Sequence, residues 1–465
     1  MEQCVKDKLI NLKFNVNEKP YTEIEICNMW YANESIDGFH NRTTLSGEEY
    51  DIDRMNFAKT ACEDDANLCE VIKINVGGET DDKGVNKISD EINDIYEKNN
   101  FDVMYRDQLE KMSATGTVGA YIYLDNAMYL SNGTVTGGDI RICYCYAENY
   151  IPLRVVNKEV IEAAFSGTDY VNGQKQTTLV IFTCDENGNY KANTFVFDKD
   201  GKQIADTWIQ LGNVKPFEVM RVAKVNNLKH MDGFGYPKLI KAIPALKAID
   251  LSMMIFFGDL DKGEKIMLTN ELLVMLNPTD GKPKEPSKLM KKLFVFLGKD
   301  VPEAKSLIQE YNPILRVDDI TKCLELALGL LSLMFGFGTK QYKFESGQIQ
   351  TATQYIGERQ DCMKELNKQR KQSNQYIDHL TRAIMWFSNQ FKETAYDLNA
   401  DITIGYDDSY IEDKSTKISE MRTDAMSFPE IEKFTIAFIM ERFNLSEKEA
   451  KAIYENRTIE ETPTV

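Results

Sequence analysis

Apolar residues recur at two different spacings along the chain, and the change of spacing divides it into segments. From residue 21 to about residue 111 the pattern favours helices, as in EINDIYEKNNFDVMYRDQLEKM, with polar loops such as GGETDDKG between them. From residue 116 to about 223, β-rich runs such as TVGAYIYL, TTLVIFTC and YKANTFVFD alternate with the turn clusters SNGTVTGGD, DENGN and DKDGK. The sequence therefore predicts N-terminal helices followed by an antiparallel sheet.

Helical spacing returns after the turn GFGYP and continues to about Leu268, with Pro237 at the first helical position and Pro244 marking a kink or the true start. Two apolar strands, LLVML and LFVFL, follow around a Pro- and Lys-rich loop, and then a helical VPEAKSLIQEY. A second helix is expected over DDITKCLELALGLLSLMF, capped by Asp318 or Asp319. This order predicts a small α/β module inserted between two helices.

A glycine-rich polar stretch, FGFGTKQYKFESGQIQTATQ, interrupts the helical region before apolar spacing resumes from about Thr351 to Phe391. At 1.5 Å per residue, ~40 residues make a rod of about 60 Å, which equals the diameter expected for a compact chain of this length. A strand ADITIGYDD, an acidic linker and the helices PEIEKFTIAFIMERF and SEKEAKAIYENR complete the pattern, the last opened by a capping box from Ser446 to Glu449. The fold class predicted is α+β, with a long helix that would cross the whole subunit.

Composition narrows the classes of protein that fit this pattern. A chain of 465 residues with 43% apolar residues can fill several cores. Its 73 acidic and 55 basic residues give a net charge of −18, which argues against a DNA binder that neutralises phosphates along a basic face. The first residues lack an apolar signal core and no apolar run reaches ~20 residues, so we expect no membrane segment. Nine scattered cysteines without C-x-x-C spacing predict free thiols and synthesis in a reducing cytoplasm.

The sequence offers no positive sign of catalysis. No phosphate-binding G-x-x-x-x-G-K-[ST] or G-x-S-x-G nucleophile motif occurs, and His40, His230 and His379 lack metal-ligand spacing. FDKDGKQ resembles part of a calcium loop but lacks the acidic twelfth ligand, so a hairpin turn is favoured. Cys143 and Cys145 alternate on a strand and point to one face, which favours packing over redox chemistry. We expect no enzyme, no cofactor and no metal, although a Ser/His/Asp arrangement stays open.

Two groups of polar residues are candidates for contact with a polyanion. The cations Lys364, Lys368, Arg370 and Lys371 share the predicted long helix, where a solvated face is favoured over nucleic-acid binding. The polar interruption before that helix, residues 336–350 and called the insert below, is mostly uncharged and flanked by glycines. Transient contact with DNA and a plain surface loop fit its composition equally well. Its candidate residues, with the first helical position that follows, are Lys340, Gln341, Tyr342, Lys343, Gln348, Gln350 and Thr351.

Four stretches, in this order, are similar to segments of one known family. They are IEICNMWYANE, MSATGTVGAYIYLD with YAENYIPL, GFGYPKLIKAIPALKAIDLSMM, and FPEIEKFTIAFIMERFNLSEKEAKAIYENR. They resemble the N-terminal Trp and Tyr segment, the first wing strands, the start of the first stem helix and the terminal helical pair of the portal proteins of tailed bacteriophages. The siphophage portals of Gram-positive hosts are the most similar in character, and the resemblance spans most of the chain, from residue 21 to about 457.

The resemblance implies an elongated portal-type subunit with long stem helices, kinked wing helices, an antiparallel wing sheet and a small α/β clip. The wing would comprise residues 1–236, the stem helices 237–268 and 317–335, and the clip 269–316. The insert, 336–350, would be the tunnel loop, followed by the long wing helix and return strand, 351–412. Residues 413–465 would form the crown, which is short for the family.

The function that the resemblance implies is that of a non-enzymatic ring of about twelve copies at one capsid vertex, through which double-stranded DNA is packaged and ejected. The clip would dock the large terminase and then the head-completion adaptor, and the ring would also meet the major capsid and scaffold proteins. The protein would be assembled in the bacterial host cytoplasm and reside in the virion. At −18 for each subunit, such a ring would carry a charge on the order of −200, which helps keep DNA from sticking.

Residue roles follow from the same resemblance. The seven candidate residues of the insert and its end would face DNA, Lys262 and Lys265 are candidate channel lysines, and Lys282, Lys284 and Lys288 are candidates for binding the clip's partners. One alternative from a different class stays open, a capsid-associated structural or scaffold protein without DNA passage. A DNA-processing hydrolase ranks last, because its motifs are missing.

Overall fold

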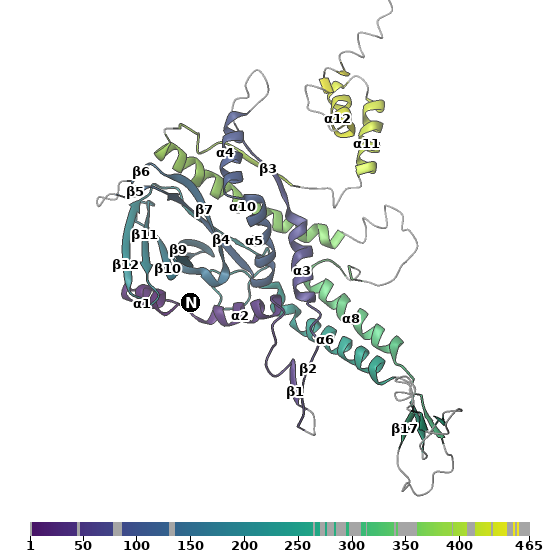
Figure 1. Ribbon diagram of the computed structural model, residues 1–465. Helices are drawn as coiled ribbons and strands as arrows, with labels where there is room; N and C mark the ends of the chain where they lie inside the picture. Colours follow the sequence, from purple (N-terminus) through teal and green to yellow (C-terminus); the bar gives the residue numbers. More distant parts are fainter. Residues whose placement is uncertain are drawn as a thin grey trace, which may run out of the picture.

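The structure is a computed structural model. It describes residues 2–43, 47–77, 86–129, 135–263, 266–269, 275–276, 283–284, 294–296, 308–312, 314–338, 341–342, 360–392, 394–406, 414–428, 431–443, 450–451 and 453–454. Helices and antiparallel sheets are combined in it, which confirms the α+β fold class (Figure 1). Among these residues, none of the helices combines the length and the apolar character that crossing a bilayer would need.

The N-terminal part is mainly helical, but it also contains strands. The expectation of helices throughout residues 21–111 is wrong at the short hairpin within residues 41–51. It is also wrong at β3 (Val71–Val76), which pairs antiparallel with β19 (Ile402–Tyr406) and buries Ile74 and Val76. The partner strand lies over 300 residues away, so the local pattern does not reveal the pairing. The other elements are α1 (Gln3–Asn11), α2 (Lys19–Tyr31), the hairpin β1 (Asn41–Thr43) and β2 (Glu49–Asp51), α3 (Phe57–Ala66), η1 (Asn67–Cys69), α4 (Lys87–Lys98) and α5 (Phe101–Thr115).

Two antiparallel sheets confirm the strand-rich region expected between residues 116 and 223. One sheet has the order β13-β4-β7 and the other β12-β11-β10-β9-β8, and the turn at Asp198 joins β11 to β12 as a hairpin. The strands are β4 (Thr117–Asp125), β7 (Asp139–Tyr146), β8 (Tyr150–Val156), β9 (Glu159–Val171), β10 (Gln174–Cys184), β11 (Tyr190–Phe197), β12 (Gln203–Gln210) and β13 (Phe217–Arg221), with a small ladder of β5 (Met128–Tyr129) and β6 (Val135–Thr136).

Aromatic rings join the two sheets. The Phe217 ring of β13 lies 5.7 Å from the Phe165 ring of β9 and 5.3 Å from the Phe182 ring of β10, and Tyr121 of β4 lies 5.2 Å from Phe165. Phe165, Phe182 and Phe217 are almost completely buried. Because a buried aromatic side chain removes a large apolar area from water, these rings form the centre of the core that holds the sheets together.

Helices α6 (Lys238–Lys262) and α8 (Val317–Phe335) pack side by side and project from the body, and we call this pair the stalk (Figure 1). At 1.5 Å per residue they are about 38 Å and about 28 Å long. The expected bounds of the second helix, 317–335, are confirmed. Far from the body, Arg316 binds Asp259 through two hydrogen bonds of 2.9 and 2.7 Å, which tie the two helices together where they meet the tip.

Three details of the stalk differ from expectation. Helix α6 ends at Lys262 rather than near Leu268, because the chain continues as β14 (Ile266–Thr269) and Gly263 lies so close to Leu315 that a Cβ would clash at 2.3 Å. Pro244 lies inside α6. Asp318 and Asp319 occupy the first turn of α8 instead of the N-cap, where their charges still favour the helix N-terminus.

The tip of the stalk is built from short strands. β14 pairs in parallel with β17 (Phe294–Phe296) and antiparallel with β18 (Ile308–Tyr311), while β15 (Met275–Leu276) pairs with β16 (Pro283–Lys284). Strands are therefore present within LLVML and LFVFL, as predicted. The helix predicted over VPEAKSLIQEY is wrong at Ile308–Tyr311, since a short apolar run fits either state by periodicity alone, and residues 301–307 lie outside the described part.

After the insert, α10 (Gln360–Phe391) extends for about 48 Å and ends where the sequence predicts. Its expected start near Thr351 lies outside the described residues. The segment read as an acidic linker contains α11 (Lys414–Ser427), a correction, and α11 packs against α12 (Glu432–Phe443). Residues 450–451 and 453–454 are helical, as expected for the last helix, whereas its capping box lies beyond what the structure describes.

Candidate functional site

Only some of the residues singled out from the sequence lie in the described part of the chain. Gln341 is exposed and Tyr342 half-buried. Lys262 is the last residue of α6 and Lys284 lies in β16 at the tip. The following candidates lie outside the described residues: Lys340, Lys343, Gln348, Gln350, Thr351, Lys265, Lys282 and Lys288.

The insert begins with a sharp turn at the end of α8. Gly336 has a φ of +99° and its N–H bonds to the Ser332 carbonyl at 3.1 Å, while the Phe337 N–H reaches the same carbonyl at 3.0 Å. This pattern of bonds closes a helix C-terminus and requires the left-handed backbone that glycine adopts readily. A Cβ at Gly336 would also lie 3.0 Å from Glu365 of α10. The glycine therefore redirects the chain where stalk and body meet.

Tyr342 anchors the insert to the body. Its hydroxyl donates to Oδ2 of Asp64 in α3 at 2.7 Å, and its ring packs edge-on against Phe57 and Phe337 at 6.3 and 6.4 Å. Burial, together with the bond to Asp64, raises the pKa of the Tyr342 phenol far above its ordinary value. The sequence suggested a DNA-facing side chain here, but the structure places Tyr342 against its own chain, a contact that the polar surroundings did not indicate.

Two ion pairs hold the same junction together. Lys238, at the start of α6, lies 2.6 Å and 2.7 Å from the two carboxylate oxygens of Asp65, and the side chains are only 1% and 8% exposed. Lys224 donates to the Met334 carbonyl of α8 at 3.1 Å and lies 3.3 Å from Glu365 of α10. Helices α3, α6, α8 and α10 thus converge where the insert begins. Nothing in the sequence pattern marks Lys238 or Asp65 as partners.

Beside this junction lies a hollow of about 650 Å³ that is rich in cations. We call it the basic pocket and define it by six side chains. They come from the β8–β9 turn, the end of β13, the loop 222–236 and α10, and are Lys158, Arg221, Lys224, Lys229, Lys368 and Lys371. Two of them belong to the cation cluster of the long helix, so the helix face expected to be solvated forms one wall of a concave site.

Hydrogen bonds fix the loop that lines the basic pocket. The buried Gln369 of α10 accepts from the Ala223 N–H at 3.0 Å. The Asn226 side chain donates to the Phe234 and Gly235 carbonyls at 3.0 and 3.2 Å and accepts from the Leu228 N–H at 2.9 Å. These contacts tie the loop to α10 and link its own turns to each other.

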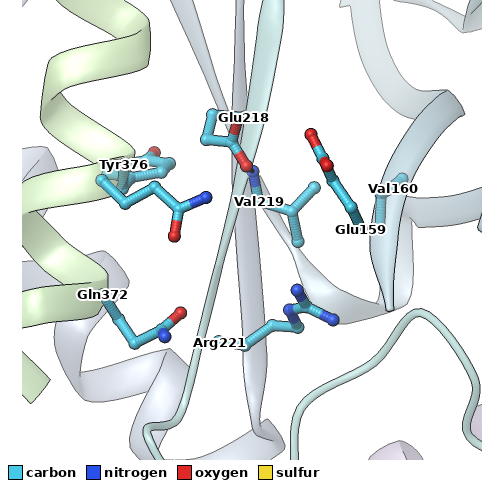
Figure 2. A pocket seen from close by; sticks show the side chains of 8 residues that line it. Glu159, Val160, Glu218, Val219, Arg221, Gln372 and Tyr376 are labelled. Atoms are coloured by element: carbon cyan, nitrogen blue, oxygen red, sulfur yellow. Dashed lines mark hydrogen bonds between the residues drawn. The ribbon is translucent and has the colours of Figure 1, made fainter. Parts of the chain in front are cut away.

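A smaller hollow adjoins the basic pocket and shares Arg221 with it. Figure 2 shows Glu218 and Val219 of β13 between Tyr376 and Gln372 of α10 on one side and Glu159 on the other. Its volume of about 20 Å³ suits a single water molecule and no substrate. The hollow is a polar gap in the body and no binding site for an organic ligand.

The Glu218 carboxylate in that wall is buried but well partnered. It lies 2.5 Å from Nδ1 of His379 and 2.9 Å from Nζ of Lys215. Burial acts to raise the Glu218 pKa, yet the hydrogen bonds and charges of His379 and Lys215 bring it below its ordinary value. The hydrogen bond to Glu218 in turn raises the His379 pKa. This group joins β13 to α10 electrostatically.

The remaining candidates from the sequence have structural surroundings. Cys143 and Cys145 lie on one face of β7, with their Sγ atoms 3.9 Å apart, at the wall of a mainly apolar cavity of about 370 Å³ between the sheets. His40 lies 3.2 Å from the buried Asp250 and His230 lies 2.6 Å from Glu23. Within the described ranges, no three His, Cys, Asp or Glu side chains are grouped so that they could hold a metal ion.

The chain was also compared with known proteins. No protein-family model matches it, and no curated protein gives a significant match.

Proposed function

We propose that this chain is a portal protein, one of about twelve subunits of a ring at a capsid vertex through which double-stranded DNA is packaged and ejected. The resemblance of the four sequence stretches to portal segments supports the proposal. The order of the elements supports it: N-terminal helices and sheets, a two-helix stalk with a small β tip, the insert, and a long helix that returns across the body (Figure 1).

The observation that carries the proposal is an exposed leucine stripe on the stalk. Leu326, Leu330 and Leu333 of α8 are 67%, 42% and 54% exposed, although they recur at the i, i+4, i+7 spacing of a packed helix face. The opposite face of α8 is already used, because Ala327, Leu328, Leu331 and Phe335 are buried. The stripe is thus a second apolar face with no partner within the described chain.

Helix α6 of the stalk also has exposed apolar side chains. Ile255, Phe257 and Leu260 are 40%, 41% and 45% exposed. An apolar surface along a projecting helix pair is unfavourable in water and typical of a protein interface. If copies of the chain stand side by side, the stalk of one copy would cover the apolar residues on the stalk of its neighbour. A contact of this kind joins two different faces, and repeated contacts close into a ring when the rotation between neighbouring copies divides a full turn.

The proposed roles of the remaining segments follow from this arrangement. The insert starts at the inner end of the stalk, so in a ring the inserts of all copies would lie at one level, with Lys340, Gln341, Lys343, Gln348, Gln350 and Thr351 meeting DNA briefly. Lys262 and Lys265 would lie near the outer end of the stalk. The tip, with Lys282, Lys284 and Lys288, would dock the large terminase and then the adaptor, while the body would meet capsid and scaffold proteins in the virion.

Negative-stain electron microscopy of the purified chain tests the proposal. The expected particles are rings with an open central hole wide enough for a duplex. Rings or discs without a hole would favour a structural capsid protein without DNA passage. Compact solitary particles would contradict the ring itself.

A further inference from the structure

The basic pocket is an exception within a strongly acidic chain. The protein has a net charge of −18, yet six cations surround this hollow, and among the described residues that line it Asp232 is the one carboxylate. Like charges held close together repel, and the repulsion is strongest where burial limits solvent screening. Burial lowers the pKa of Lys224, and the charge of Lys238, which does not line the pocket, lowers it further. The hollow is therefore a site of mainly positive charge.

Most of the positive charge in the basic pocket is not neutralised by the described residues. Lys224 and Lys368 share one carboxylate, Glu365, at 3.3 and 3.5 Å. For Lys158, Lys229 and Lys371, which are exposed, and for Arg221, the structure shows no carboxylate within 4 Å in the part of the chain that it describes. The hollow therefore has room and charge for an external anion that brings more than one negative group.

We propose that the basic pocket binds the phosphate backbone of a nucleic acid. Phosphate oxygens accept hydrogen bonds from lysine, arginine and amide side chains, and Asn227 and Gln372 also line the hollow. A volume of about 650 Å³ exceeds the need of one inorganic ion and accommodates neighbouring phosphates of one strand.

The position of the pocket agrees with this ligand. Lys224 bonds to the Met334 carbonyl, two residues before the turn at Gly336, so the pocket adjoins the base of the insert. The choice of double-stranded DNA as the ligand rests on the proposed portal function. The pocket is formed within one chain, so DNA binding by the pocket does not depend on the ring, and an experiment can refute one of the two without refuting the other.

Fluorescence anisotropy with a labelled DNA duplex tests the assignment. The variant Lys158→Gln/Lys229→Gln/Lys371→Gln removes three exposed cations of the pocket, and Lys98→Gln/Lys199→Gln/Lys202→Gln removes three exposed cations elsewhere. We expect the pocket variant to bind the duplex about 10-fold more weakly at about 50 mM salt, and the dependence of log affinity on log salt to become shallower by about 1 for each lost phosphate contact. The control variant should match the wild type within about 2-fold.

Two results would overturn the assignment. Equal weakening by both variants would mean that only total charge matters. Unchanged DNA binding by the pocket variant, with a smaller assembly in light scattering, would assign the pocket to an interface between copies. Circular dichroism spectra and melting curves identical to those of the wild type establish that the variants are folded. If the wild type is a monomer in light scattering and the pocket variant binds DNA more weakly than the wild type, the proposed ring is refuted but DNA binding by the pocket is supported.

Discussion

The hydroxyl of Tyr342 donates a 2.7 Å hydrogen bond to Oδ2 of Asp64 and so joins the insert after α8 to helix α3. The next residue of α3, Asp65, binds Lys238 at the start of α6. One turn of α3 thus holds both the insert and the first helix of the stalk. A change at this turn should alter how firmly both are attached to the body.

Replacing Tyr342 with Phe tests the anchor of the insert. The ring contacts with Phe57 and Phe337 remain, but the half-buried Asp64 loses its hydrogen-bond donor, so we expect the free energy of unfolding to fall by about 1 kcal/mol. Urea titration measures the change. Tyr123→Phe is the matched control, because the Tyr123 hydroxyl has no hydrogen-bond partner among the described residues. Equal stability of the two variants would show that the bond to Asp64 contributes nothing.

The Lys238–Asp65 pair should be much more sensitive, because both side chains are buried. Lys238→Met removes the cation beside the buried Asp65 carboxylate, which keeps its 2.6 Å hydrogen bond from the Ser113 hydroxyl. We expect the free energy of unfolding, measured with urea, to fall by about 3–5 kcal/mol. The double variant Lys238→Met/Asp65→Leu should recover part of this loss, since no charge is then buried. A single variant that loses less than about 1 kcal/mol would contradict the pairing.

The His379–Glu218 pair predicts a pH dependence of stability. Because the His379 pKa is raised from 6.5, its contribution is fully present below pH 6.5 and is lost as the pH rises through the raised value. The Glu218 pKa is lowered from 4.5, so its contribution is present above pH 4.5 and is lost as the pH falls through the lowered value. The pair should therefore stabilise the fold most between pH 4.5 and 6.5.

Urea unfolding of the wild type and of His379→Asn across this range measures the effect. The difference in the free energy of unfolding between the two proteins should be largest from pH 4.5 to 6.5 and should shrink as the pH rises further. The two groups titrate as a pair, so the curve reports their joint behaviour. A difference that grows with pH would mean that the pair is not charged in the folded protein.

The sequence predicted best the elements whose determinants are local. The bounds of α8 follow from its apolar spacing and from Gly336 at its end, and the end of α10 at Phe391 follows in the same way. Pairings between distant segments could not be predicted. β3 has its partner strand near Ile402, more than 300 residues away, and the residues on both sides of β3 have helical spacing.

In the candidate site, too, local spacing could be predicted from the sequence but contacts between distant residues could not. Spacing along the chain identified Lys368 and Lys371 as neighbours on one helix, but the basic pocket also needs Lys158 and Lys229, which only the folded chain brings near them. Tyr342 was expected to face DNA, but the structure places its hydroxyl against Asp64. Its partner Asp64 lies 278 positions earlier, so the contact depends on tertiary structure.

The central claim is that copies of the chain stand side by side and cover the leucine stripe of the stalk. Light scattering coupled to size exclusion tests it on the wild type, on Leu326→Glu/Leu330→Glu/Leu333→Glu, and on a control with the exposed residues Val103, Met128 and Ile204 changed to Glu. The account predicts a mass of about twelve chains of 53.2 kDa for the wild type and the control, and smaller species for the stripe variant. A wild type with the mass of one chain, or a stripe variant that assembles like the wild type, would contradict it.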